Sequence, residues 1–280
     1  MEIGIPECLE AALQDVGANP GALVIAGGTD VMVGVNFGRL RPQRLVALGR
    51  VPELRTMSLD EPVAMGAGVT FAQIAQTTAE PALRQAALTV GSPQVRNRAT
   101  VGGNLGTCSP AGDALPVLAA LDARIGVRSA KAARELTLEE FMLGPKRSAL
   151  SPDELVVEVS WRPAGRSQSF LKIGPRHAMV IAVASVAVVI DRRRRRVGVA
   201  LGSLAPTVVR VRAAETVLQQ ALEQSGWRAL SLPRDAVAEA ADLAASAARP
   251  IDDLRASAAY RRHLARVLTA RAVGSACACT

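Results

Sequence analysis

Aromatic side chains are scarce in this 280-residue sequence and make up only 2% of it. Proteins that hold single-stranded nucleic acid stack the bases on aromatic side chains. The formal charge of +8 therefore does not by itself indicate nucleic acid, and no expected helix gathers the basic residues on one face. We expect no nucleic-acid partner, and we attribute the charge to an acidic protein partner or to arginine-rich usage in a GC-rich coding sequence.

Cysteine and histidine are also few. The cysteines are Cys8, Cys108, Cys277 and Cys279, and the histidines are His177 and His263. No CxxC pair occurs, and the spacing fits neither a zinc site nor an iron–sulfur cluster. HExxH and GxSxG motifs are missing as well. We therefore expect no metal site and reduced thiols, assign neither histidine to catalysis, expect His263 to be solvated, and expect the tail around Cys277 to be frayed.

Long hydrophobic runs are absent. The longest candidate, residues 178–190, is shorter than the roughly 18 residues of a membrane span and is better interpreted as a strand. Residues 1–6 carry no basic segment typical of a secretory signal. Hydrophobic residues make up 49% and charged residues 21%, as in folded globular proteins. We expect a cytoplasmic protein.

The order of the expected elements indicates an α+β fold. Before residue 163 we expect short strands at 22–26, 44–48, 63–67, 123–127 and 155–161. Between them we expect a helix or irregular turn at 29–38, a helix at 70–78 capped by Thr70, helices at 81–90 and 114–121, and a loop at 92–98. After it we expect strands at 169–173, 182–190 and 197–202, then helices at 208–224, 235–248 and 253–272. A domain boundary is therefore expected near residue 163.

Five consecutive arginines, at positions 192–196, lie between two of these strands. The first interpretation is a solvated connection of a hairpin. The second is a docking contact for an acidic partner. The sequence leaves both open.

Two Gly-Gly turns carry the chemical information. They are AGGTD at residues 26–30, after an expected strand, and TVGGN at residues 100–104, after a loop. Residues without a β-carbon let the backbone approach an anion and let successive N–H groups converge on it. Neither turn matches GxGxxG or GxxxxGK[ST]. Two such turns can hold a diphosphate from both sides, although each alone is most often just a turn.

A third segment, SPAGD at residues 109–113, offers a hydroxyl and a carboxylate beside a proline. Such groups suit the hydroxyls of a ribityl or ribose chain. Asp113 also precedes an expected helix, so an N-cap is the alternative.

Together, AGGTD (26–30), VRNRATVGGN (95–104) and SPAGD (109–113) resemble the FAD-binding medium subunit of molybdenum hydroxylases. This is the family of xanthine dehydrogenase and aerobic carbon monoxide dehydrogenase. GAGVT at 66–70 is similar to the family's segment between the glycine motifs. Lys172 followed by Arg176 looks like its stretch after the domain junction, and DDLRASAAYR at 252–261 resembles its C-terminal signature. The resemblance covers nearly the whole chain.

This resemblance implies a two-lobed FAD-binding domain of the vanillyl-alcohol-oxidase (PCMH) type in residues 1–163. It implies a smaller C-terminal α+β domain of the carbon monoxide dehydrogenase flavoprotein type in residues 164–280. The residues that it places around FAD are Val24, Ile25, Ala26, Gly27, Gly28, Thr29, Asp30, Val31, Thr100, Val101, Gly102, Gly103, Asn104, Ser109, Asp113 and Lys172.

The resemblance also implies an electron-transfer function. Electrons would arrive from [2Fe-2S] clusters on a small partner subunit and leave to NAD, a quinone or another acceptor. A large subunit would carry the molybdopterin cofactor, in a dimer of heterotrimers. Because redox chemistry belongs to the cofactor, no acid–base pair or nucleophile is expected, and FAD is expected to be non-covalent. The alternatives are a free-standing FAD-dependent dehydrogenase and a degenerate flavin-binding assembly protein.

Overall fold

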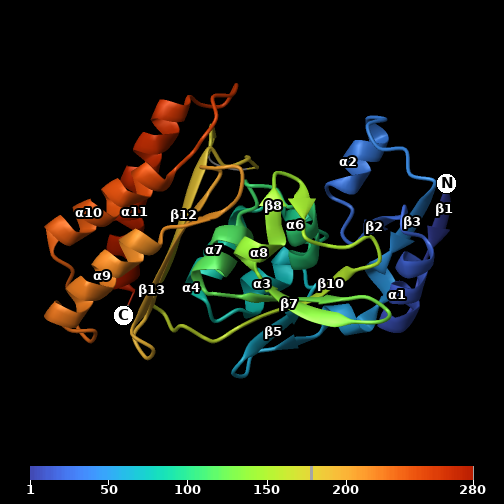
Figure 1. Cartoon of the computed structure of the whole chain (residues 1–280), viewed down its shortest axis with the longest axis horizontal. Coiled ribbons are helices and arrows are strands. Elements are labelled where there is room, and N and C mark those ends of the chain that lie inside the picture. Colours follow the sequence, from blue (N-terminus) through green and yellow to red (C-terminus); the bar gives the residue numbers. More distant parts are fainter. Residues whose placement is uncertain (177–178, 280) are drawn as a thin grey trace.

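A computed structural model describes residues 1–176 and 179–279 (Figure 1). His177 lies outside the described residues. The molecule is elongated: the N-terminal strands lie at one end of its long axis, and the last three helices of the chain lie at the other (Figure 1). Within the described part of the chain, no helix has both the length and the apolar character needed to cross a membrane.

The first lobe is built on three short parallel strands in the order β1-β3-β2. They are β1 (Glu2–Gly4), β3 (Arg44–Ala47) and β2 (Leu23–Ile25). Helix α1 (Leu9–Ala18) buries the apolar face formed by Ala12, Leu13 and Val16. Helix α2 (Val31–Asn36) buries none of its residues, although four of the six are Val or Met. The short 3-10 turns η1 (Leu48–Arg50) and η2 (Pro52–Arg55) lead to the second lobe.

The second lobe contains an antiparallel sheet in the order β4-β5-β10-β6-β7. Its strands are β4 (Met57–Ser58), β5 (Val63–Gly66), β10 (Leu155–Trp161), β6 (Arg124–Arg128) and β7 (Ala133–Thr137). Its helices are α3 (Phe71–Thr77), α4 (Pro81–Thr89), α5 (Pro93–Arg96), α6 (Val101–Thr107), α7 (Ala114–Ala120) and α8 (Leu138–Phe141), followed by the small pair β8 (Met142–Gly144) and β9 (Arg147–Ser148). Thr70 caps α3 through its side chain, as predicted.

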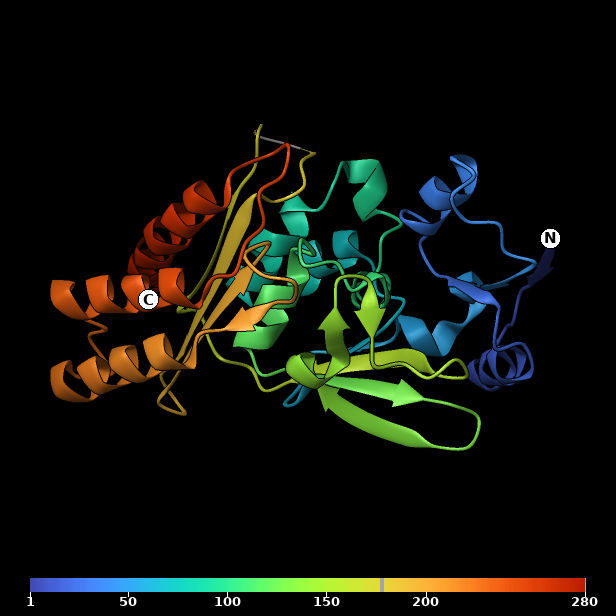
Figure 2. The same cartoon turned by 45° about the horizontal axis from the view of Figure 1, so that its top comes forward.

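The C-terminal part contains an antiparallel sheet in the order β11-β12-β13-β14. Its strands are β11 (Gln168–Ile173), β12 (Ala184–Asp191), β13 (Arg196–Gly202) and β14 (Val209–Arg210). Three helices cover one face, namely α9 (Arg212–Ser225), α10 (Arg234–Ala247) and α11 (Ala258–Ala278). Helices α4 and α7 of the second lobe pack on the opposite face (Figures 1 and 2).

Strand β12 is buried along its whole length. Ala187 and Val189 belong to the core of the N-terminal part, whereas Val186, Val188 and Ile190 belong to the core formed with α9–α11. Because successive side chains in a strand point to opposite faces, one strand serves two cores. This explains the continuous apolar run in the sequence.

Residues 192–195 of the arginine run form the turn between β12 and β13, and Arg196 begins β13, as the hairpin interpretation predicts. It is not simply solvated, however. Arg193 and Arg194 both pair with Glu61, and Arg196 pairs with Asp122, so these three arginines bind the N-terminal part of the same chain. The carboxylates that contact the run therefore come from within the protein.

A buried carboxylate also joins the two parts. Glu80 is 3% exposed and accepts hydrogen bonds from Trp161 Nε1 and Ala164 N, each at 3.3 Å, and from Gln168 Nε2. Burial raises the pKa of Glu80, and these three donors only partly offset the effect. Glu80 thus fixes residues 161–168, which connect β10 of the second lobe to β11 of the C-terminal part.

The α+β class and most expected elements are confirmed, but the loop at 92–98, the bounds of the last helix and the frayed tail were wrong predictions. The loop expected at 92–98 contains α5, which Ser92 caps by accepting the Val95 N–H. The last helix begins after its cap Ser257 and continues to Ala278. Ala272 and Ala276 are fully buried, so the tail that carries Cys277 is packed and not frayed. His263 is exposed, as expected.

Candidate functional site

The first glycine turn joins β2 to α2. Gly28 has φ +77°, a conformation that favours glycine. The backbone N–H groups of residues 27–31 donate to no acceptor within the described residues. A short stretch of backbone donors is therefore available, as the diphosphate hypothesis requires.

The first turn lies against the segment that leads into the second. A β-carbon on Gly27 would stand 1.9 Å from the carbonyl oxygen of Arg98 and 3.0 Å from the α-carbon of Ala99. Thr100 follows directly. The two Gly-Gly motifs, far apart in the sequence, are thus adjacent in the fold. The glycine at position 27 is required by this backbone contact.

The second glycine turn differs from what we expected, because its N–H groups are already in use. Val101 donates to Val69 O at 3.0 Å, Gly102 to Ala67 O at 2.8 Å, and Gly103 to Thr100 Oγ1 at 3.0 Å. The interpretation of bare amides therefore holds for the first turn and is wrong for Gly102 and Gly103. They instead fix the start of α6 against the GAGVT segment.

The two glycines of the second turn face different surroundings. A β-carbon on Gly102 would lie 2.5 Å from Ala67 Cβ, so this position is closed. A β-carbon on Gly103 would meet only Thr100 Oγ1, at 3.1 Å. Gly103 is half-buried, and a small group on it would point away from the rest of the chain. Position 103 is therefore the one at which a side chain would enter the surface formed by the two turns.

Asp113 and Lys172 form a buried ion pair. Lys172 Nζ lies 2.5 Å from Asp113 Oδ2, and the two side chains are 7% and 5% exposed for Lys172 and Asp113. Thr89 joins the pair, since its hydroxyl donates to Asp113 Oδ2 and its carbonyl accepts from Lys172 Nζ, both at 3.2 Å. Burial raises the pKa of Asp113, against the lowering effect of the Lys172 ammonium.

This geometry overturns the N-cap alternative for Asp113, whose side chain makes no capping hydrogen bond to α7. The carboxylate turns instead to Lys172, on β11 of the C-terminal part. Thr89, at the end of α4, is a member of the cluster that the sequence analysis missed. Nothing near Thr89 in the sequence indicates the contact, because both partners lie far along the chain.

Two buried oxygen atoms near this pair have no partner. Asp113 Oδ1 and Asn104 Oδ1 accept no hydrogen bond in the described part of the chain. Asn104 lies beside the segment that precedes Asp113, because a β-carbon on Gly112 would be 2.8 Å from Asn104 Nδ2. Since buried polar groups are normally hydrogen-bonded, these two acceptors indicate a donor supplied from outside the chain.

The other predicted site residues surround these groups. Val24 and Ile25 end β2, and Ile25 Cδ1 lies 3.3 Å from the β-carbon position of Gly28. Ser109 Oγ accepts the Ala111 N–H at 3.3 Å and keeps its own proton for a ligand. Ala26 and Thr29 are half-buried and Asp30 is exposed in the turn, and half-buried Val31 opens α2. Cys108 packs nearby, where burial raises the pKa of its thiol to about 11.

We refer to residues 24–31, 100–104, 109, 113 and 172 as the candidate site. Contacts run continuously through it, from Gly27 to Arg98, along α6 to Asn104, then to Gly112 and the Asp113–Lys172 pair. It combines free backbone donors at one end with buried charged and polar groups at the other. Such a set suits an elongated ligand with a diphosphate and several hydroxyl or ring polar atoms.

Two family models match the chain. Residues 1–161 match the family model described as the FAD binding domain in molybdopterin dehydrogenase. Residues 169–276 match the CO dehydrogenase flavoprotein C-terminal domain.

Relatives match over nearly the full chain. The 6-hydroxypseudooxynicotine dehydrogenase complex subunit alpha of Paenarthrobacter nicotinovorans is 31% identical, over 91% of this chain and 86% of the relative. The xanthine dehydrogenase FAD-binding subunit of Escherichia coli O157:H7 is 29% identical, over 96% and 94%. A solved carbon monoxide dehydrogenase from Hydrogenophaga pseudoflava superposes with a TM-score of 0.91 at 28% identity, covering 100% of this chain and 98% of that one. This chain therefore belongs to the FAD-binding medium subunits of the molybdenum hydroxylase family, the family of xanthine dehydrogenase and carbon monoxide dehydrogenase, and is a flavoprotein oxidoreductase subunit.

Proposed function

We propose that this chain is the electron-transfer subunit of a molybdenum-containing hydroxylase. It would take electrons from [2Fe-2S] clusters of a small partner subunit and pass them to an external acceptor such as NAD or a quinone. The observation that carries the proposal is a continuous series of contacts, which leads from the free N–H groups of residues 27–31 to the Asp113–Lys172 pair. The domain boundary near residue 163 and a cytoplasmic location belong to the same proposal.

The residues present fit FAD as a ligand. The free amides of residues 27–31 suit the diphosphate. The unpartnered oxygens of Asn104 and Asp113 suit hydroxyl or ring N–H donors of the cofactor. Lys172 adds a positive charge in a buried setting. A bound flavin would supply the capacity to take up and release electrons, which side chains lack.

The chain itself would bind, orient and shield the cofactor. The Gly27–Arg98 contact fixes the first turn relative to α6, so the donors are positioned before the ligand arrives. The Asp113–Lys172 pair links the second lobe to β11 and so closes the site from the C-terminal part. We assign no residue to proton transfer or nucleophilic attack.

Partner subunits are proposed from the names of relatives. One relative is called a complex subunit alpha, and another, from Hydrogenophaga pseudoflava, is called a medium chain. We propose a small [2Fe-2S] subunit and a large molybdopterin subunit, arranged as a dimer of heterotrimers.

Purification tests the proposal directly. The tagged chain is expected to show a flavin absorption spectrum and to co-purify with proteins that contain molybdenum and iron–sulfur clusters. Acid precipitation is expected to release the yellow colour into the supernatant, because we propose non-covalent FAD. Colour retained in the pellet would contradict non-covalent binding. Flavin without partners would favour a free-standing dehydrogenase, and absence of flavin would favour an assembly protein.

A further inference from the structure

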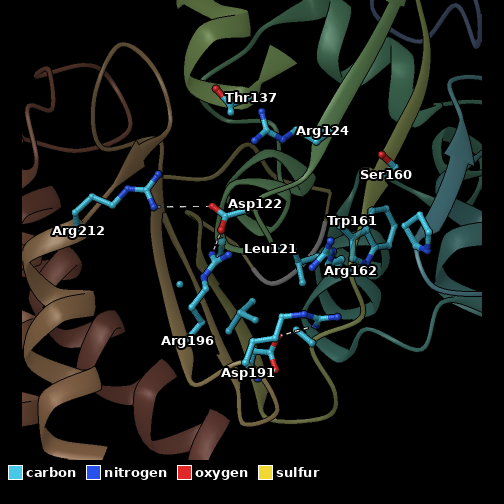
Figure 3. Close-up of a pocket in the computed structure, with 16 residues that line it drawn as sticks. Leu121, Asp122, Arg124, Thr137, Ser160, Trp161, Arg162, Asp191, Arg196 and Arg212 are labelled. Carbon is cyan, nitrogen blue, oxygen red and sulfur yellow. Dashed lines mark hydrogen bonds and ion pairs between the residues drawn. The ribbon is translucent and has the colours of Figure 1, made fainter. Parts of the chain in front are cut away.

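A second site candidate lies between the two parts of the chain, away from the candidate FAD site. It is a cavity of about 600 Å³ lined by five arginines and two aspartates (Figure 3). No residue of the candidate FAD site lines it. Its charged lining residues are Asp122, Arg124, Arg162, Asp191, Arg194, Arg196 and Arg212. We call it the arginine cavity.

One wall is a row of residues on one face of the second-lobe sheet. Arg124 on β6 is directly opposite Thr137 on β7 and Ser160 on β10. Arg162 follows Ser160 by two residues, and this spacing places both on the same side of an extended chain. The two arginines therefore reach the cavity from neighbouring positions (Figure 3).

These two cations are the least compensated charges in the cavity. Within the described residues, neither Arg124 nor Arg162 makes a hydrogen bond or an ion pair. Hydrogen bonds from the backbone and hydroxyl of Thr137 lower the pKa of Glu140, and the charge of Arg124 adds to this effect. Ser160 likewise has a hydroxyl with no partner among the described residues. In contrast, Arg194 is neutralised by Asp191 at 2.9 Å and by Glu61.

The opposite wall comes from the C-terminal part and is crowded with cations. Arg196 pairs with Asp122, and Arg212 approaches the same carboxylate at 3.9 Å (Figure 3). Buried Arg210 also pairs with Asp122 and with Glu215. Arg212 also contacts Glu139 at 3.4 Å and Glu215 at 3.7 Å. Desolvation and, after it, the neighbouring Arg210 guanidinium lower the pKa of Arg196. The one carboxylate of Asp122 contacts the guanidinium groups of Arg196, Arg210 and Arg212.

We propose that the arginine cavity binds a small phosphorylated ligand with two or more phosphate groups, held between Arg124 and Arg162 on one wall and Arg196 and Arg212 on the other. Guanidinium groups bind phosphate oxygens in pairs and remain charged at all working pH values. The volume is in the range of small-molecule sites. Because the two walls belong to the two parts of the chain, such a ligand also ties those parts together.

Titration of the full chain with inorganic pyrophosphate tests the proposal by calorimetry. The chain is first loaded with FAD and then freed of unbound FAD by gel filtration, so that the candidate FAD site is occupied and no free diphosphate competes with the probe. The unmodified chain is expected to bind pyrophosphate and to gain a few degrees in melting temperature. The double variant Arg124→Gln/Arg162→Gln is expected to bind at least about tenfold more weakly, since two charge-assisted contacts are lost.

A matched control removes two other exposed arginines. Arg166→Gln/Arg228→Gln changes the net charge equally, both residues are exposed, and neither lines the arginine cavity. Its affinity for pyrophosphate is expected to be unchanged. Circular dichroism and thermal melting without pyrophosphate check that both double variants fold. The same titration without FAD separates this proposal from the proposed function, because the cavity contains none of the flavin-site residues.

Three outcomes would overturn the proposal. The first is no binding of pyrophosphate by the unmodified chain at millimolar concentration. The second is an equal loss of affinity in both double variants, which would indicate non-specific charge attraction. The third is pyrophosphate binding by the flavin-free chain that disappears in the FAD-loaded chain after unbound FAD has been removed, which would place the anion at residues 27–31.

Discussion

Gly27 and Arg98 touch backbone to backbone, so closely that a β-carbon on Gly27 would lie 1.9 Å from the Arg98 carbonyl oxygen. This contact places the first glycine turn beside the second. It also gives position 27 a structural requirement for glycine that is independent of any ligand.

Gly27→Ala is expected to destabilise the chain, because the Arg98 backbone has to move to admit the methyl group. Overpacking of this kind costs about 1–3 kcal/mol. Gly17→Ala is the control: position 17 lies in α1 with nothing within 4 Å, so alanine is expected to raise stability by up to about 1 kcal/mol. Urea unfolding of flavin-free protein measures both. Equal stabilities for the two variants would contradict the contact.

Gly103→Val is expected to abolish FAD retention while leaving the fold largely intact. The new side chain would meet only Thr100 Oγ1 within the protein and would project into the surface between the two turns. Gly106→Val, on the same helix and with nothing within 4 Å, is the matched control. The ratio of flavin to protein absorbance reports the result. Normal flavin content in the Gly103 variant would show that the site is misplaced.

Lys172→Met is expected to cost about 3–5 kcal/mol, because it leaves the buried Asp113 carboxylate without its cation. The double variant Asp113→Leu/Lys172→Met is expected to lose less than the sum of the two single changes, because no unpaired charge remains. Unfolding of flavin-free protein isolates this effect from cofactor binding. Additive losses would mean that the two residues are not coupled.

Glu80 predicts a pH dependence of stability. Its native pKa is raised by burial, so the native state takes up this proton at a higher pH than the unfolded state does. The free energy of unfolding contributed by Glu80 therefore decreases as pH rises from the ordinary value of 4.5 to the raised native value. Beyond that pH the contribution stays at its lower level.

Glu80→Gln mimics the protonated group and is expected to remove this slope. Gln168, whose buried Oε1 has no partner among the described residues, can offer that oxygen to the new amide. Unfolding curves at several pH values between 4.5 and 8 compare the two proteins. Parallel pH profiles for the variant and the unmodified chain would contradict a raised pKa at Glu80.

Local patterns in the sequence predicted most elements, whereas the residues of the candidate site came from the family resemblance and stay a prediction. Thr70 before Phe71 and the glycine pair after the apolar run at 22–26 were informative, because caps and turns depend on adjacent residues. The unbroken apolar stretch of β12 predicted a strand. It did not reveal that the two faces of this strand belong to different cores.

Long-range contacts explain what the sequence analysis missed. Gly27 lies against Arg98, and Gly102 lies against Ala67. Close packing therefore requires glycine at both positions, in addition to any role in binding an anion. In the sequence Asp113 is a candidate N-cap, and only the fold shows that Lys172 lies beside it. The arginine run finds Glu61 and Asp122 only in the folded chain, where distant carboxylates come within reach.

The hydrogen bonds around Glu80 have a practical consequence for dissecting the protein. A fragment that stops at Trp161 would keep the carboxylate but discard the Ala164 and Gln168 donors. A fragment that starts at Ser169 would lack helices α4 and α7, so one face of β12 would be exposed. Separate expression of either half is therefore expected to give aggregating material, and deletion studies should keep residues 162–168 with both halves.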